Sequence, residues 1–417
     1  MSASQSICNR GWRVALAGLG VNLLLGTLYA WGVMGKALVV QLHWSKTDAV
    51  LPFAVSTAVF AITMVFAGRA QDKLGPRGVA SLGGLFFGLG VAASSFFSSP
   101  LAIMLCFGVV GGMGIGLAYS ATTPAAVKWF AASRKGLITG IVVSGVGLAA
   151  VFMSPLTQFL LAQSSIAQTF LILGLGSAVS ILILAQFLTN PPQGYVPTGQ
   201  AAVGQGVKVV APRRDVEWHE MLRTPQFYQL WVMYVLTASA GLMIIANVPI
   251  IAKEQAGWEA GFVPVMLLAV FNTLGRFSSG ALSDRLGRTH TMVIAFALQA
   301  INLFFFAHYT SPLSIALGAS FAGMCYGTIF TLMPAATADY YGLRNMGVNY
   351  GLVFTGFGVA GVFGSLLGGR VRDMFGSFDL AYVICAGMLL AAAVLAWFMR
   401  TPQIAVQSVP DAAEQPA

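Results

Sequence analysis

The chain has 417 residues, of which 57% are hydrophobic and only 8% are charged. A soluble domain carries about 25% charged residues, so this chain cannot cover a water-exposed surface, and we expect an integral membrane protein. The net charge of +9 would also suit nucleic-acid binding, but the positions of the basic residues argue against it. The four cysteines lack metal-ligand spacing, and we predict no metal or cofactor.

Twelve apolar runs are long enough to cross the hydrocarbon layer as helices. They cover residues 12–39, 47–68, 77–98, 100–122, 137–161, 168–189, 225–252, 258–283, 289–308, 312–334, 349–369 and 378–399. The sequence therefore predicts an all-α membrane protein with twelve transmembrane helices. The first run is too long for a cleavable signal peptide and should remain as the first helix.

The longest break between apolar runs covers residues 190–224 and is rich in Gly, Pro and Gln before it becomes charged. Such composition is typical of a linker. We therefore expect an N-terminal six-helix bundle at 1–189, a cytoplasmic linker at 190–224, a C-terminal six-helix bundle at 225–400 and a cytoplasmic tail at 401–417. The end of the linker, WHEMLRTPQF, should form a short amphipathic helix on the membrane surface.

The basic residues are distributed unequally between the two sides of the membrane. With the N-terminus in the cytoplasm, sixteen Lys and Arg residues fall on the inner side and four on the outer side. The other two, Lys36 and Arg276, lie within spans, and Lys36 is near enough to the outer end to snorkel. The bias predicts that both termini are cytoplasmic, in a plasma membrane of the bacterial inner-membrane type. The basic charge is thus a topology signal, and no nucleic-acid partner is expected.

The loops after the second and eighth spans repeat one pattern at an interval of 212 residues. The shared positions are Gly68, Asp72, Lys73 and Gly75 in the first loop, and Gly280, Asp284, Arg285 and Gly287 in the second. The glycines let helices approach closely, the aspartates suit the N-terminus of a neighbouring helix, and the bases suit anionic headgroups. We interpret the two loops as an inner latch that holds one conformation. A simpler interpretation, a turn with topogenic charges, is compatible with this one.

Arg276 is an isolated charge in the eighth span, a stretch of uncharged and mostly apolar residues. All thirteen acidic residues lie in loops, tails or helix ends, so no carboxylate is expected beside Arg276 within the membrane. A buried cation without a counter-ion is costly, and water or a substrate anion would supply what is missing. The planar guanidinium suits a carboxylate held by two parallel hydrogen bonds. The alternative is a structural arginine tied to backbone carbonyls.

The twelve spans, the central loop and the duplicated loop resemble the major facilitator superfamily of secondary transporters. The segment WFAASRKGLITGIVVSGVG, Trp129 to Gly147, is similar to the fifth-helix signature of the monocarboxylate transporters. EMLRTPQF, Glu220 to Phe227, and the pair Tyr29 and Trp31 are similar to bacterial oxalate and formate antiporters. The resemblance implies two pseudo-symmetric six-helix bundles around a midplane site that opens alternately to either side. It also implies that the Arg276 helix binds substrate.

The chain departs from these relatives at two places. Monocarboxylate transporters usually carry an aspartate one turn before the arginine, where this chain has Asn272. An amide on the same helix face can orient a ligand but cannot titrate, which puts the family's proton relay in doubt. The eleventh-helix lysine of the oxalate antiporters aligns with Phe357. Without that lysine, the one midplane arginine matches a substrate with a single negative charge.

These observations predict a secondary transporter of small monocarboxylates of the lactate or pyruvate type. Arg276 would bind the carboxylate, with Asn272, Tyr119, Tyr326 and Tyr29 shaping the pocket. The resemblance favours proton symport, whereas Asn272 favours an organic-anion exchanger like the oxalate and formate antiporters. A transporter-like carboxylate sensor is a weaker alternative, because the tail after Arg400 is short. An enzyme is not expected, since no nucleophile with its base and no cluster of His and acidic ligands is found. The sequence does not identify a partner protein.

Overall fold

The computed structural model describes residues 3–27, 31–192, 195, 215–258 and 262–402. All regular elements in this part of the chain are helical. The first half contains α1 (Ala3–Leu25), α2 (Trp31–Gln41), α3 (Lys46–Leu74), α4 (Pro76–Ala93), η2 (Ser94–Phe96), α5 (Pro100–Ile103), the π-helix η3 (Met104–Gly111), α6 (Gly112–Val127), η4 (Ala132–Arg134), α7 (Lys135–Gln163) and α8 (Ile166–Ala185). The second half contains α9 (Trp218–Met221), α10 (Pro225–Ala256), α11 (Phe262–Leu286), α12 (Arg288–Phe306), α13 (Pro312–Tyr341), α14 (Met346–Phe375) and α15 (Asp379–Trp397).

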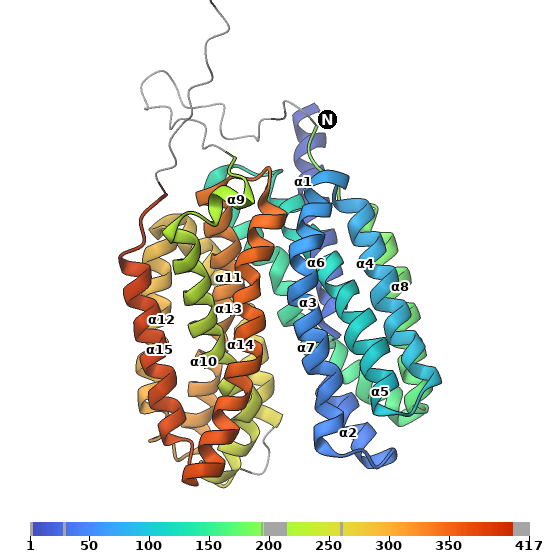
Figure 1. The fold of residues 1–417 in the computed structure, drawn as a ribbon, viewed down its shortest axis with the longest axis vertical. Coiled ribbons are helices and arrows are strands. Elements are labelled where there is room, and N and C mark those ends of the chain that lie inside the picture. The colour runs from blue at the N-terminus through green and yellow to red at the C-terminus, as the bar shows by residue number, and fades with distance from the viewer. Residues whose placement is uncertain (1–2, 28–30, 193–194, 196–214, 259–261, 403–417) are drawn as a thin grey trace, which may run out of the picture.

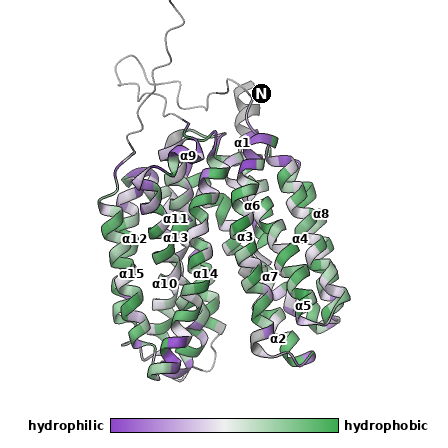
Figure 2. Cartoon of the chain, viewed as in Figure 1, coloured by the Kyte–Doolittle hydropathy of each residue, from purple (hydrophilic) through white to green (hydrophobic). Residues whose placement is uncertain are grey.

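Eleven helical segments of the described chain are long and apolar enough to cross a membrane. The first expected span, 12–39, is covered by α1 and α2, and residues 28–30 between them lie outside the described part. Figure 2 shows apolar residues along the lengths of the helices and hydrophilic residues gathered at their ends. Most of the expected linker, 193–194 and 196–214, also lies outside the described residues. The short helix expected at its end is α9.

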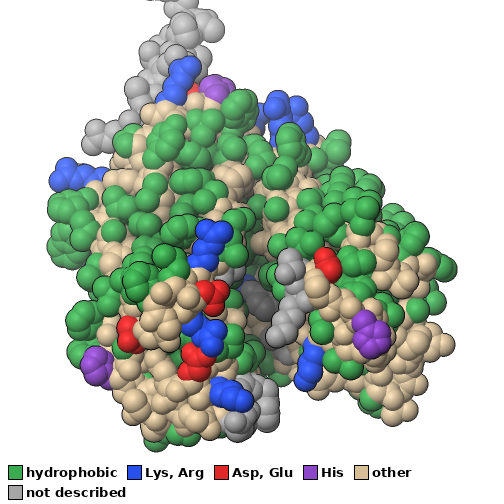
Figure 3. Space-filling view, turned by 60° about the horizontal axis from the view of Figure 1, so that its bottom comes forward, with side chains coloured by type: hydrophobic (Ala, Val, Ile, Leu, Met, Phe, Trp, Pro, Cys, Tyr) green, Lys and Arg blue, Asp and Glu red, His purple; other side chains and the backbone are tan. Residues whose placement is uncertain are grey.

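The helices form two bundles side by side, with α1 to α8 in one and α10 to α15 in the other (Figure 1). The bundles meet mainly through two helix pairs, α3 against α14 and α7 against α11. The N-terminus of α1 and the short α9 mark one end of the molecule, and α2 marks the other. At the α2 end, the space-filling view shows a hollow between the two bundles (Figure 3).

Glycines bring the paired helices into backbone contact. A Cβ atom on Gly136 or Gly140 of α7 would overlap the backbone of α11, at Gly280 and Arg276 respectively. A Cβ on Gly347 of α14 would overlap the backbone of α3. Small residues at such crossings allow the close packing that holds helices together in lipid. We call the contacts α7–α11 and α3–α14 the two seams, and the Arg276 site lies on the first of them.

Candidate functional site

Arg276 is fully buried, with 0% of its surface exposed. Its Nε donates a hydrogen bond of 2.8 Å to Oδ1 of Asn272, one helical turn earlier on α11. Its Nη1 donates a hydrogen bond of 2.7 Å to the backbone carbonyl of Val143 on α7. Since α7 belongs to the other bundle, this side chain joins the two halves of the molecule in the middle of the α7–α11 seam.

The flat face of the guanidinium lies against an aromatic ring. The Cζ atom of Arg276 is 4.3 Å from the centroid of the Phe330 ring on α13, which is a favourable cation–π distance. In the described part of the chain, no carboxylate lies within ion-pair distance of Arg276, and its Nη2 has no hydrogen-bond partner. The buried cation is therefore surrounded by neutral groups, with one nitrogen unsatisfied.

The structure places the predicted site residues at different distances from the arginine. Asn272 contacts it directly and is 2% exposed. The ring of Tyr326 packs edge-on against Phe330, with centroids 5.2 Å apart, so it belongs to the layer behind that ring. Tyr119 lies in an aromatic cluster with Phe60 and Phe354, described below. Tyr29 lies outside the described residues.

Sequence reasoning missed two groups that contact the guanidinium of Arg276. The Val143 carbonyl is a backbone atom, and no side-chain type marks it. Phe330 follows Tyr326 by one helical turn on α13, and this spacing could have identified Phe330 from the sequence as a neighbour of the site. The contact to a backbone carbonyl also agrees with the structural interpretation of Arg276. In this conformation the arginine links α11 to α7, and its Nη2 is a hydrogen-bond donor without a partner.

The duplicated aspartates cap helices of the opposite bundle. Asp72 on α3 accepts hydrogen bonds from the backbone N–H groups of Gly347 and Val348, at 3.2 and 3.1 Å, where α14 begins. A carboxylate at a helix N-terminus satisfies free N–H groups and interacts favourably with the helix dipole. This contact fastens the end of the α3–α14 seam that lies near the α1 N-terminus.

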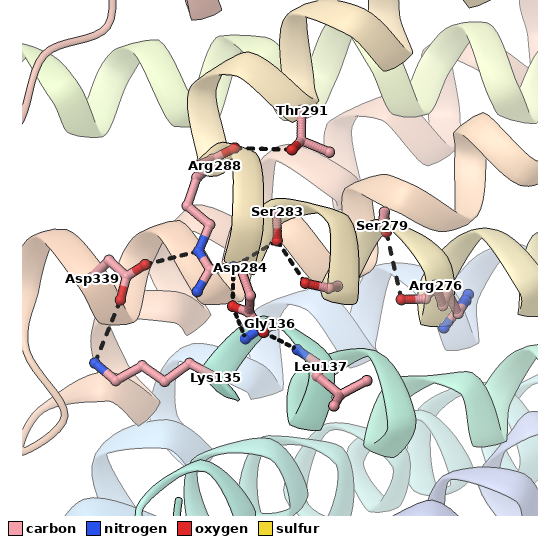
Figure 4. Close-up of polar contacts among 12 residues, drawn as sticks. Lys135, Gly136, Leu137, Arg276, Ser279, Ser283, Asp284, Arg288, Thr291 and Asp339 are labelled. Atoms are coloured by element: carbon pink, nitrogen blue, oxygen red, sulfur yellow. Dashed lines mark hydrogen bonds and ion pairs between the residues drawn. The ribbon is translucent and has the colours of Figure 1, made fainter. Parts of the chain in front are cut away.

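The second aspartate repeats the arrangement on the other seam. Asp284 on α11 accepts hydrogen bonds from the N–H groups of Gly136 and Leu137, at 2.9 and 2.8 Å, where α7 begins (Figure 4). We call the Asp72 and Asp284 contacts together the latch, and the end of the molecule that holds them the latch end. Both seams are thus closed at the latch end, while the hollow of Figure 3 lies at the α2 end.

An ion-pair network surrounds the second half of the latch. Arg288 lies 2.6 Å from Asp284 and 2.8 Å from Asp339, and Lys135 of α7 lies 3.5 Å from Asp339 (Figure 4). The other expected bases of the loops, Lys73 and Arg285, are exposed, as headgroup anchors would be.

The glycines that end the two loop repeats have a conformational role. Gly75 and Gly287 have φ values of 85° and 90°, a region that side chains with a Cβ rarely adopt. Each therefore permits the sharp turn between the span that carries the aspartate and the helix that follows.

The end of the linker is fastened to the C-terminal bundle at the latch end. Asp215 accepts hydrogen bonds from the N–H groups of Leu343 and Arg344, both at 3.0 Å. Lys128, at the end of α6 in the other bundle, is close enough to interact electrostatically with Asp72 and Asp215. Burial lowers the pKa of the Lys128 ammonium, and the two carboxylates act in the opposite direction.

A helical membrane chain with two paired bundles and a repeated aspartate loop defines the architecture of a secondary transporter. The sequence matches the family model of the Major Facilitator Superfamily over residues 14–301 and 265–416, and the chain belongs to that family. It is a transporter-family protein and not an enzyme.

The compared proteins agree with this assignment. The oxalate:formate antiporter of Oxalobacter formigenes is 28% identical over 94% of this chain and 91% of its own length. Human monocarboxylate transporter 12 is 26% identical over 76% of this chain and 66% of its own length. The crystal structure of the human organic anion transporter MFSD10 (TETRAN) superposes with a TM-score of 0.69 at 14% identity, covering 95% of this chain and all of that one. At 14% identity, the superposition supports the fold and nothing beyond it. The resemblance seen in the sequence is confirmed for the superfamily, and the similar proteins include an oxalate:formate antiporter and monocarboxylate transporters.

Proposed function

We propose that this transporter carries small monocarboxylates of the lactate or pyruvate type by alternating access, with Arg276 binding the carboxylate. The observation that carries the proposal is the unsatisfied Nη2 of a fully buried guanidinium whose other partners are neutral. A carboxylate offers two oxygens in one plane, which matches the two terminal nitrogens of arginine. A bound monoanion would supply the single negative charge that Arg276 lacks among its described neighbours.

The bond between Arg276 and Val143 suggests how binding would be coupled to movement. In the present conformation Nη1 holds a carbonyl of the opposite bundle. A carboxylate bound through both terminal nitrogens would replace that carbonyl and weaken the α7–α11 seam near its centre. Opening of the latch end requires this seam to part. Substrate binding would therefore favour the transition to the other side.

The latch end is proposed to face the cytoplasm, because the inward bias of basic residues places both termini there. The present conformation is then closed to the cytoplasm. Asp72 and Asp284 would act as the gate, since each holds the first turn of a helix in the other bundle. The relatives from bacteria support an inner-membrane location.

The coupling of transport has two candidates. Similarity to monocarboxylate transporters supports symport with a proton. Exchange is favoured by a specific observation, which is that the neighbour of Arg276 is the non-titratable Asn272. An empty carrier that opens its latch end would lose the Val143 carbonyl and leave the cation less compensated, which would disfavour reorientation without a substrate.

Uptake into proteoliposomes separates these candidates. Labelled lactate is offered to the reconstituted full chain with and without an inward proton gradient, and with and without unlabelled lactate inside. Stimulation by the gradient alone indicates symport, and a strict requirement for internal lactate indicates exchange. Absence of flux under every condition, combined with saturable lactate binding, would replace the transporter proposal by a carboxylate sensor.

The role of Arg276 is tested by an Arg276→Gln variant that elutes as a monodisperse peak in detergent. Loss of lactate binding supports the proposal. Retained affinity would mean that the arginine only ties α11 to α7.

A further inference from the structure

Arg276 has a counterpart at the equivalent place in the other half of the molecule, and that counterpart is Met64. A Cβ on Gly140 of α7 would overlap the carbonyl oxygen of Arg276, and a Cβ on Gly351 of α14 would lie 2.6 Å from that of Met64. Gly351 follows Gly140 by 211 residues, and Arg276 follows Met64 by 212. The two seams are therefore built in the same register.

A second set of glycine contacts extends this register by one turn. A Cβ on Gly327 of α13 would overlap the backbone carbonyl of Asn272, and a Cβ on Gly116 of α6 would lie 3.0 Å from that of Phe60. The intervals are again 211 and 212 residues. Asn272, which orients Arg276, thus corresponds to Phe60. By the same intervals, Phe330 corresponds to Tyr119 and Val143 to Phe354.

The surroundings of the two corresponding positions differ in chemistry. On the α11 side lie a cation, an amide and a backbone carbonyl that accepts a hydrogen bond. On the α3 side, Phe60, Tyr119 and Phe354 form an aromatic cluster, with ring centroids 4.9 to 5.9 Å apart. Met64 beside them is fully buried, at 0% exposure. The symmetric scaffold therefore carries polar groups on the α11 side, which we call the first wall, and apolar side chains on the α3 side, which we call the second wall.

We propose that Met64 and Phe60 determine specificity by making the second wall apolar, so that the site accepts an anion with one carboxylate and an apolar remainder. The inference rests on the proposed function, because it assumes that Arg276 binds the first carboxylate. A dianion would bring its second carboxylate to Phe60, Met64 and Phe354, whose side chains carry no charge and no hydrogen-bond donor. Burial of an unpaired carboxylate is strongly unfavourable, whereas a methyl or ethyl group gains from apolar contact.

The test compares two anions of equal carbon number, propionate and malonate, as competitors of labelled lactate uptake by the full chain. At a pH where malonate is fully ionised, wild type should prefer propionate by about 100-fold or more, as an uncompensated buried charge requires. The variant Met64→Lys places a cation at the counterpart of Arg276. It should reduce this preference at least tenfold and permit uptake of labelled malonate. Met374→Lys, which adds the same charge at a position that is 76% exposed at the end of α14, should keep the wild-type preference.

The outcomes distinguish this inference from the proposed function. Equal competition by malonate and propionate in wild type, with both abolished by Arg276→Gln, would overturn the inference and leave the carboxylate anchor intact. A folded Met64→Lys variant that gains no malonate uptake would overturn the assignment of Met64. If neither anion competes in wild type, the monocarboxylate proposal itself fails. Should Met64→Lys not fold, Phe60→Asn gives α3 the amide of its counterpart, and an unchanged preference in that variant would argue against Phe60.

Discussion

The carbonyl oxygen of Val143 accepts a hydrogen bond from Arg276 across the boundary between the two bundles, at 2.7 Å. The backbone of one half thus satisfies a charged side chain of the other, in the middle of the seam that parts in the transport cycle that we propose. The bond makes Arg276 both a tie between the bundles and the anion site that we propose.

Arg276→Lys tests the shape of the cation separately from its charge. A lysine keeps the positive charge but cannot reach Asn272, Val143 and a carboxylate with the fixed geometry of a guanidinium. We expect lactate affinity to fall by about 10- to 100-fold, equivalent to ~1.4–2.8 kcal/mol. Equilibrium binding in detergent measures this loss. Wild-type affinity in the lysine variant would show that charge alone is sufficient.

Asn272→Asp tests whether this position can carry a proton. An ionised aspartate beside Arg276 would neutralise it and compete with the substrate, so binding at neutral pH should weaken. Protonation of the aspartate at lower pH removes that competition, so affinity should recover as the pH falls. Lactate binding as a function of pH measures the effect, with wild type as the reference. An unchanged pH profile would argue against position 272 as a proton site.

Asp284→Asn tests the latch. The substitution removes the charge that accepts hydrogen bonds from Gly136 and Leu137, and such charge-assisted bonds contribute about 1.5–3 kcal/mol. We expect the latch end to open more often. A Thr139→Cys reporter on α7, where Thr139 is fully buried, should then react faster with a maleimide. Asp72→Asn should raise the rate in the same way, and equal rates in all three proteins would contradict the gating role.

Gly140→Ala tests the close approach of the α7–α11 seam. The added methyl would overlap the Arg276 carbonyl, and overpacking of this kind costs about 1–3 kcal/mol. We expect weaker closure of the latch end together with weaker lactate binding, because the shift displaces Arg276 from Val143. Gly351→Ala should weaken closure with a smaller effect on binding, because its contact is Met64. Gly176→Ala, with nothing within 4 Å of its added Cβ, is the control.

The architecture could be predicted from the sequence because its causes are local and repeated. The lengths of the apolar runs define helices, and the aspartate loops at an interval of 212 residues show that the two halves share one plan. Arg276 stood out because a charge in an apolar span is rare. The same interval applied to Arg276 falls on Met64, so the apolar counterpart was available in the sequence as well.

The immediate surroundings of Arg276 could not be predicted in the same way. Its partner on α7 is a carbonyl, which every residue possesses, and only the three-dimensional register of the seam selects Val143. Asn272 was expected to face a ligand, but its Oδ1 bonds to the arginine. Tyr119 was expected to shape the pocket, and it lies in the aromatic cluster of α3, α6 and α14, on the side of the proposed site that is opposite in the symmetry to Arg276. These outcomes depend on how the bundles fit together, which side-chain patterns on single helices do not encode.

Both seams are lined by glycine, and this has a consequence for the speed of the conformational cycle. At the glycine contacts, backbone meets backbone with no side chain of the glycine between them, so these contacts can separate without a change of its rotamer. The glycines then offer little resistance to the movement of one bundle against the other. Discrete polar contacts between the bundles, those of Asp72, Asp284, Lys135 and Arg276, then contribute to the barrier, and in the cycle that we propose a single bound anion alters one of them.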